Sequence, residues 1–520
     1  MRVEQVEDRS LRLQSKMLYL PRHALLLISF VSCTVQASEG KPVSAGMSPN
    51  REAMPASAYP WQKVVVGRLK NGVRFAIMPR HSNDAGVGLL LRNEGGFIAE
   101  QRPGELGLAH LIEHIVFTSP TAGSPDDLNH FKRVGLQLTF PAPHVATTSW
   151  RESNYFLSSK TKEAGDLDRI LGLLREAATD LTFRADAVAR ERTSVMHEMA
   201  DKKLGNQIYA SYIAAVAPGS PTDVIDAQNS DDVPTASINT IRGLYRRLYR
   251  PENTMIVIVG DVNAKQMKAL IAKRFADWHP TVPAVEKAPY PTFDPTRIRP
   301  ISFSTLPQGR RTALMTVVMA QPISHTSRNR QARDEIMELL VMRAIDARLS
   351  ASQSDSAPGK RGVYIEHGEQ GHRLIMLWDY FNSDQWKPAV GGLRRTTCDL
   401  VGTGFTEGEW SIARQNVIAD LERRQSDMAK VPNVDLAIDL SHGLADGRAV
   451  IPPDEMLRHA RTMVPQTGAR LGTEWWRQQW LSGAEHLRVE APELANVAEP
   501  ASTIRTLANA AVSAPACKLP

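Results

Sequence analysis

Cysteine is nearly absent from this sequence, with three residues in 520, and the 33 glycines and 33 prolines follow no period. These features exclude a disulfide-framework protein and a collagen-like one. Lys and Arg form no run or stripe, although the formal net charge is +6, so we expect no nucleic-acid partner. Beyond the first 37 residues no apolar run approaches 18 residues, so we expect no transmembrane segment.

The composition is that of a globular protein. Hydrophobic residues make up 42% of the chain and charged residues 23%, which excludes a mainly disordered chain. A length of 520 residues is enough for two to four domains, each with its own core.

A short apolar run covers residues 24–37 and ends with small residues at Val35 and Ala37, the two positions that a signal peptidase reads. The run is too short for a stop-transfer helix. We therefore expect residues 1–37 to be a signal peptide region that is cleaved near Ala37, and the protein to be exported to the periplasm. The start at Met1 or Met17 is left open.

Two alternatives to a cleaved signal peptide remain. One is a lipoprotein acylated at Cys33, which is disfavoured because Phe30 stands where a smaller aliphatic residue is usual. The other is a disordered tail. If Cys33 is removed with the signal peptide, Cys398 and Cys517 remain, and their surroundings do not decide whether they pair.

The chain divides at a proline-rich stretch, which has six prolines between His279 and Pro300 and indicates a linker. Apolar periodicity predicts strands at 64–69, 73–78, 87–92 and 257–260, and helices at 105–118, 163–180, 185–203 and 264–276. We predict a flexible lead over 38–60, a peptidase domain over 61–279, a linker over 280–300, a second domain over 301–495 and a tail over 496–520.

The two halves resemble each other. A shift of 222 positions places Phe183 on Phe405, Val195 on Val417 and Glu198 on Asp420. A duplicated α+β unit is the simplest account of this match. We therefore predict an α+β fold of two tandem homologous α/β-roll units, each a mainly antiparallel sheet packed with helices, of which only the first has a metal site.

The first unit contains the motif H-x-x-E-H, formed by His110, Glu113 and His114. Histidines four positions apart project from one face of a helix, which is the spacing that two nitrogens need to share one Zn²⁺. Glu113 lies on the same side and can take a proton from a metal-bound water. The alternative is a helix with two half-exposed histidines and a surface glutamate, which fits poorly with the apolar residues between them.

A catalytic zinc needs a third protein ligand and one open position. The helical run 189–201 offers Glu191 and Glu198, two turns apart on one face, so that one could bind zinc while the other supports a ligand histidine. His197 is a competing ligand, but it points about 100° away from Glu198.

These motifs resemble those of the pitrilysin/insulinase family of zinc metallopeptidases. The resemblance covers about 64–280 well and 300–490 loosely. It rests on the H-x-x-E-H motif with Gly107-Leu108-Ala109 before it, and on Glu191-Arg192-x-x-Val195-x-x-Glu198, Asn71-Gly72, Gly95-Gly96, Glu100, Tyr249-Arg250-Pro251 and Val259-Gly260-Asp261.

By this resemblance, one Zn²⁺ per chain is bound by His110, His114 and Glu198. Glu113 is the general base and Glu191 a supporting catalytic carboxylate.

Substrate binding in the family resembles the addition of a strand to a sheet edge. The matching residues here are Val145, Ala146 and Thr147, with Val145 where the family usually has Asn. Tyr364 resembles a substrate-contacting tyrosine of the family, but the arginine expected seven residues before it is missing, since position 357 is alanine. The resemblance also implies a homodimer, or a heterodimer with a second two-domain subunit.

The sequence therefore predicts a zinc-dependent endopeptidase that hydrolyses peptides or unfolded polypeptides. An alternative is a non-catalytic peptide-binding subunit of a two-subunit peptidase of the same fold. A purely structural zinc site fits badly, because such sites usually have four Cys or His ligands.

Overall fold

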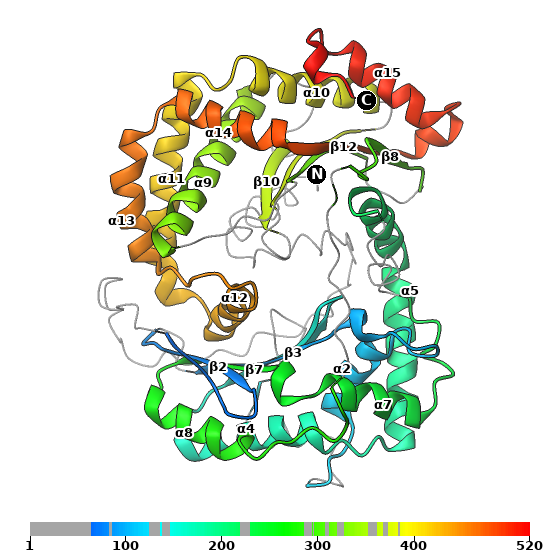
Figure 1. Cartoon of the computed structure of the whole chain (residues 1–520), viewed down its shortest axis with the longest axis vertical. Coiled ribbons are helices and arrows are strands. Elements are labelled where there is room, and N and C mark those ends of the chain that lie inside the picture. Colours follow the sequence, from blue (N-terminus) through cyan, green and yellow to red (C-terminus); the bar gives the residue numbers. More distant parts are fainter. Residues whose placement is uncertain are drawn as a thin grey trace, which may run out of the picture.

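The computed structural model describes residues 64–82, 86–123, 136–137, 146–218, 229–284, 294, 296–306, 311–319, 327–351, 361–367, 373–382 and 385–519. In this part the chain forms two sheets with helices packed on them, one in the lower and one in the upper half of Figure 1. The predicted signal peptide region 1–37, the lead 38–60 and Val145 lie outside the described residues.

The first sheet has the strand order β1-β2-β7-β3-β6-β4, with β5 also paired to β6. All its pairs are antiparallel except β2 with β7. The strands are β1 (Val65–Arg68), β2 (Arg74–Pro79), β3 (Val87–Glu94), β4 (Leu136–Gln137), β5 (Ala146–Thr148), β6 (Glu152–Ser159) and β7 (Thr254–Gly260).

The second sheet has the order β10-β11-β9-β12-β8, and only β12 and β8 are parallel. Its strands are β8 (Ile301–Ser304), β9 (Thr312–Met319), β10 (Arg361–His367), β11 (Arg373–Tyr380) and β12 (Gly483–Glu490). Read as β8-β12-β9-β11-β10, this sheet repeats the order and the directions of β2-β7-β3-β6-β5. The predicted fold class, two similar mainly antiparallel α+β units, is confirmed.

The helices of the first unit are α2 (Leu108–Thr118), α4 (Ala164–Thr179), α5 (Ala185–Val216), α7 (Ile238–Leu248) and α8 (Ala264–Phe275). Those that follow the linker are α9 (Arg328–Ala351), α10 (Trp386–Gly402), α11 (Glu407–Asp427), α12 (Asn433–Ala445), α13 (Pro453–Met463), α14 (Ala469–Ser482) and α15 (Pro500–Ala510). No helix in the described residues is long and apolar enough to cross a membrane.

Strands of the first sheet are apolar on both faces because helices cover both. Leu89 and Leu91 of β3 lie in a core with α2, α4, α5, α7 and α8, while Leu90 between them lies in a core with α12. This alternation follows from the period of two in a strand. Since α12 comes from beyond the linker, the second half of the chain supplies part of the core of the first sheet.

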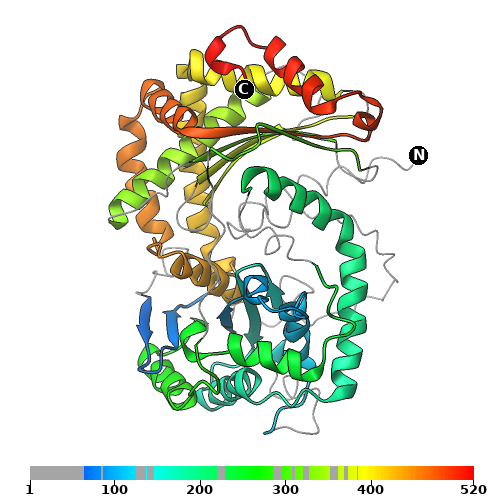
Figure 2. The same cartoon turned by 45° about the vertical axis from the view of Figure 1, so that its right-hand side comes forward.

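The exchange also runs in the other direction. Helix α5 was predicted to end at residue 203 but continues to Val216. Val188 and Val195 face the first core, whereas Ile213 and Val216 pack on the second sheet with Val318 and other residues. Figures 1 and 2 show α5 running from the lower unit to the upper sheet. Because the apolar stripe changes face along the helix, its periodicity does not predict the full length.

Both ends of α12 are held by buried arginines of the first unit. At its start Arg80 donates hydrogen bonds to Val431 O (3.0 Å) and to the Asn433 side chain (3.1 Å). At its end Arg151 donates to Ala445 O (3.0 Å) and to Asp446 Oδ1 (2.7 Å). A guanidinium at the carboxyl end of a helix binds the unsatisfied carbonyls and interacts favourably with the helix dipole.

Helix α12 also approaches the sheet very closely. A Cβ added at Gly88 of β3 would lie 2.4 Å from the backbone of Asn433 and Val434. Only glycine leaves room for this contact.

Cys398 of α10 and Cys517 form a disulfide, which settles the pairing that the sequence left open. The prediction of a tail over 496–520 is wrong for the described part. Helix α15 places Ile504 and Ala508 in the second core, and Leu519 is buried there too. These short apolar residues are few and widely spaced, so the sequence gives little sign that they are buried.

We expect replacement of Arg151 by methionine to destabilise the fold by roughly 3–5 kcal/mol, because Glu94, which is buried, and Asp446, which is half-buried, would lose this partner. Urea unfolding measures the change. As a control, Arg461→Met removes an exposed pair with Glu422 and should change the unfolding free energy by less than about 1 kcal/mol. Equal effects of the two substitutions would contradict the importance of the buried contact.

We also expect acid to weaken the contact between α5 and the second sheet, where the ring of His486 on β12 lies 6.0 Å from the ring of Tyr212 on α5 between centroids. Burial lowers the pKa of His486 to about 4. The hydrogen bond to the carbonyl oxygen of Arg299 acts to raise this pKa, but burial outweighs it. The unfolded chain therefore binds one more proton between about pH 6.5 and pH 4. The stabilisation is complete above about pH 6.5 and is lost as the pH falls through this window, by at most about 1.4 kcal/mol per pH unit.

The measurement is the melting temperature between pH 7 and pH 4 for the wild type and for His486→Gln, which cannot gain this proton. The wild type should lose more of its melting temperature than the variant. Parallel losses would show that His486 does not contribute to acid sensitivity.

Candidate metal centre

Helix α2 begins directly after Gly107, whose φ of 83° lies in the left-handed region. A Cβ at this position would lie 2.7 Å from Ser230 Cα, so both conformation and space require glycine. The apolar residues of α2, such as Leu111 and Ile115, are buried in the first core. This packing turns His110 and His114 toward α5.

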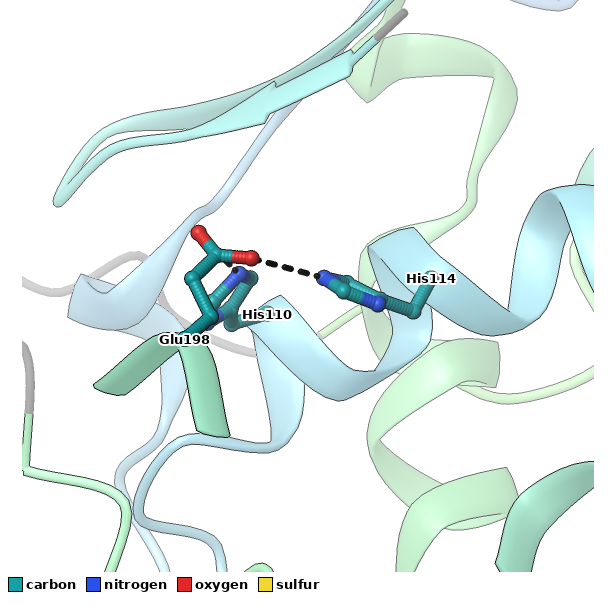
Figure 3. Close-up of side chains that lie close together, drawn as sticks. All are labelled: His110, His114 and Glu198. Carbon is teal, nitrogen blue, oxygen red and sulfur yellow. Dashed lines mark ion pairs between the residues drawn. The ribbon is translucent and has the colours of Figure 1, made fainter. Parts of the chain in front are cut away.

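The structure brings His110, His114 and Glu198 into one cluster, whose ligand atoms all lie within 4.8 Å of one another. Glu198 Oε1 is 3.5 Å from His110 Nε2, and Glu198 Oε2 is 3.4 Å from His114 Nε2. Figure 3 shows the carboxylate of Glu198 directed at both imidazoles. The two histidine rings are 5.0 Å apart between centroids.

The donor set of this cluster fits zinc. Two ligands that are each about 2.0–2.1 Å from a tetrahedral zinc lie about 3.3–3.4 Å apart, close to the separations between Glu198 and the two histidines. Two histidines and one glutamate also leave one coordination position open, as in catalytic zinc sites.

Glu191, two turns before Glu198 on α5, contacts the other nitrogen of His114. The distance from Glu191 Oε2 to His114 Nδ1 is 3.4 Å. A carboxylate can only accept here, so Nδ1 donates to Glu191, and Nε2 is the atom that faces Glu198. This is the arrangement in which an outer carboxylate orients a ligand histidine.

The carboxylates of Glu191 and Glu198 favour the positively charged form of His114. Burial lowers the pKa of His114, but hydrogen bonds to Glu191 and Glu198 outweigh it, and the pKa rises to about 9. Burial also acts to raise the pKa of Glu191, yet His114 brings it below its usual value.

Glu113 is buried, with 8% of its surface exposed, on the turn between the two histidines. Its charge reaches Tyr155 of β6 and Tyr249, which are buried and hydrogen-bonded to each other through their hydroxyl groups. Burial raises the pKa of both phenols, and the charge of Glu113 adds to this effect. Tyr249 lies in a sequence motif of the family, but nothing in the sequence around it indicates this buried pair.

His197, the competing ligand considered from the sequence, lies on the exposed side of α5 and is not in the cluster.

Of the substrate residues, Ala146 and Thr147 lie in β5, which pairs with β6 and contacts α2. Among the described residues no strand pairs with the other edge of β5. Tyr364 lies in β10, in the second sheet, opposite Met376 of β11. The structure therefore places β5 beside α2, and Tyr364 in the second sheet.

The second unit replaces this cluster by an ion pair. Asp420 of α11, 222 positions after Glu198, accepts a hydrogen bond from Arg343 of α9 (2.7 Å), and Arg343 also binds Asp346 (3.2 Å). Among the described residues, the second unit has no group of His, Cys, Asp and Glu that could hold a metal. A guanidinium thus supplies the positive charge between helices that correspond to α2 and α5.

Two family models match the chain. The model "Insulinase (Peptidase family M16)" covers residues 87–211, and the model "Peptidase M16 inactive domain" covers residues 235–340. The first match includes all three residues of the cluster.

Relatives of known sequence agree with these models. The "Probable zinc protease PqqL" of Escherichia coli is 28% identical over 243 residues, which is 46% of this chain and 26% of that protein. The protein of the same name from Haemophilus influenzae is 22% identical over 400 residues, which is 74% of this chain and 40% of that protein. This chain thus spans less than half of these relatives.

A solved structure is similar over nearly all of its length. It is the first half of the periplasmic protease PqqL from Escherichia coli, with a TM-score of 0.71 and 20% identity over 89% of this chain and 99% of that one. At this identity the likeness shows a shared fold. The family models over residues 87–211 and 235–340 and the named zinc protease relatives support the insulinase family of peptidases, family M16, as the family that this chain resembles.

Proposed function

We propose that this chain is a zinc-dependent endopeptidase acting on peptides or unfolded polypeptides. The observation that carries the proposal is the cluster of His110, His114 and Glu198, with Glu113 buried beside it. In this proposal the three clustered residues are the zinc ligands and Glu191 orients His114. Zinc bound there would lower the pKa of a water molecule and polarise the scissile carbonyl.

Glu113 has the role of general base. As a carboxylate it takes the proton of the attacking water and can pass it to the leaving amine. Its place on the turn between His110 and His114 keeps it beside the residues that would hold the metal. The hydrophobic packing of α2 excludes bulk water on the other side of the helix.

We propose that substrate binds as an extended strand along β5. The edge of β5 that pairs with no strand among the described residues offers backbone groups near Ala146 and Thr147, and the contact of β5 with α2 would bring a bound peptide to the metal. Val145, which lies outside the described residues, stays a predicted substrate residue, and Tyr364 would contact substrate from the second sheet.

We propose export to the periplasm and action together with a second two-domain unit. The disulfide between Cys398 and Cys517 suits an oxidising compartment. The similar solved structure is one half of a periplasmic protease, and this chain covers 51% of the whole of that protein. Either a second copy or a different subunit could supply the other half.

The proposed function predicts the effect of replacing Glu113. Replacement by glutamine should reduce hydrolysis of a quenched unfolded peptide by roughly 10²–10⁴-fold, because the proton acceptor is lost. Zinc content should stay at the wild-type level, since Glu113 is not a ligand. Glu474→Gln, on the exposed face of α14, is the matched control and should keep wild-type activity.

Removal of zinc by a chelator should abolish the wild-type activity and readdition should restore it. If the wild type binds zinc but hydrolyses nothing alone or as an oligomer, and Glu113→Gln captures peptide equally well, the chain is a peptide-binding subunit instead.

A further prediction distinguishes the roles of the two glutamates of α5 in zinc binding. Glu198→Gln should lose a ligand and leave little bound zinc, whereas Glu191→Gln should weaken zinc binding by about 10–100-fold, as an outer partner does. Competition with a coloured chelator measures both affinities. The reverse order of the two losses would make Glu191 the ligand.

A further inference from the structure

The segment before α2 connects this helix, which carries His110 and His114, to the hairpin of β5 and β6. The turn of this hairpin, residues 149–151, is bonded to η4 (Phe97–Ala99). Phe97 N donates to Ser149 O (3.1 Å) and Ile98 N donates to Trp150 O (2.8 Å). A Cβ at Gly96 would lie 1.9 Å from Ser149 O, so the two segments are in tight contact.

Glu100, the residue that follows η4, continues this connection to α2. Its Oε2 accepts a hydrogen bond from Gly107 N (2.9 Å), and its Oε1 accepts one from Ala109 N (2.7 Å). The residue at the N-cap of α2 is Gly107, which has no side chain that could cap the helix. Glu100 therefore binds two of the amide groups that a helix start leaves without partners.

The position is an unfavourable one for a carboxylate in other respects. Burial raises the pKa of Glu100 to about 8, against the two amide hydrogen bonds, and Glu105 and Asp232 add negative charge nearby. A serine at the N-cap could satisfy the helix without adding an acidic group to this cluster. Gly107 leaves no space for such a side chain.

We propose that Glu100 is a positioning residue that fixes the first turn of α2, and with it His110, relative to the substrate edge β5. The inference rests on the proposed function and adds a residue to it. Ala109, which Glu100 binds, directly precedes His110, so a shift of this turn moves the imidazole against Glu198 on α5. The same shift changes the distance between the metal and a peptide on β5.

The test is Glu100→Gln, in which an amide NH₂ faces one of the two backbone N–H groups and a hydrogen bond is lost. Glu105→Gln is the matched control, because Glu105 lies in the same loop and is buried, but its side chain binds Arg247 instead of the amides of α2. Three quantities are measured for each protein: zinc affinity by chelator competition, the melting temperature of the zinc-free form, and kcat and KM for the unfolded peptide.

We expect Glu100→Gln to weaken zinc binding on the order of 10-fold, the loss typical of an outer partner of a metal site, and to lower kcat more than it raises KM. Glu105→Gln should lower the melting temperature and leave zinc affinity and the ratio of kcat to KM near the wild-type values.

Wild-type zinc affinity in Glu100→Gln, or equal losses of zinc affinity in the two variants, would overturn the inference. If the wild type itself binds no zinc, the proposed function fails instead, so the two failures are distinguishable.

Discussion

Two helices cross between the units, and the remaining structure depends on how they pack. Helix α5 carries Glu198 and Glu191 in the first unit and ends with Ile213 and Val216 against the second sheet. At a rise of about 1.5 Å per residue, the 18 residues from Glu198 to Val216 span about 27 Å. Helix α12 returns the contact by covering the first sheet. Neither sheet would have a complete core alone.

This exchange gives a structural role to the second unit, which has no metal-binding group among its described residues. The second unit buries the far end of α5, and through it holds the helix that presents a carboxylate to His110 and His114. The charge that a metal would supply is provided there by Arg343, bound to Asp420. An arginine is always charged, so this helix pair is stabilised without any ligand.

Local patterns predicted much of the fold. Apolar periodicity located α4 and α8 to within a residue or two, because each has one buried face and one exposed face. It did not predict the end of α5, where the apolar residues turn from the first core to the second sheet. It also did not predict α15, because the apolar residues of this segment are too few to indicate a buried helix. The pairing of Cys398 and Cys517 had no local signal, since it depends on how α15 folds back to α10.

For the candidate site, the sequence by itself determined that His110 and His114 face the same way, because the helix repeat fixes residues four positions apart. The resemblance to a family indicated which glutamate of α5 to expect beside them. Only the tertiary structure decided the distances from Glu198 to the two imidazoles, the buried phenol pair and the cap that Glu100 places on α2. These contacts join residues from separate elements, and their geometry is set by how α2, α5 and β6 pack around one core.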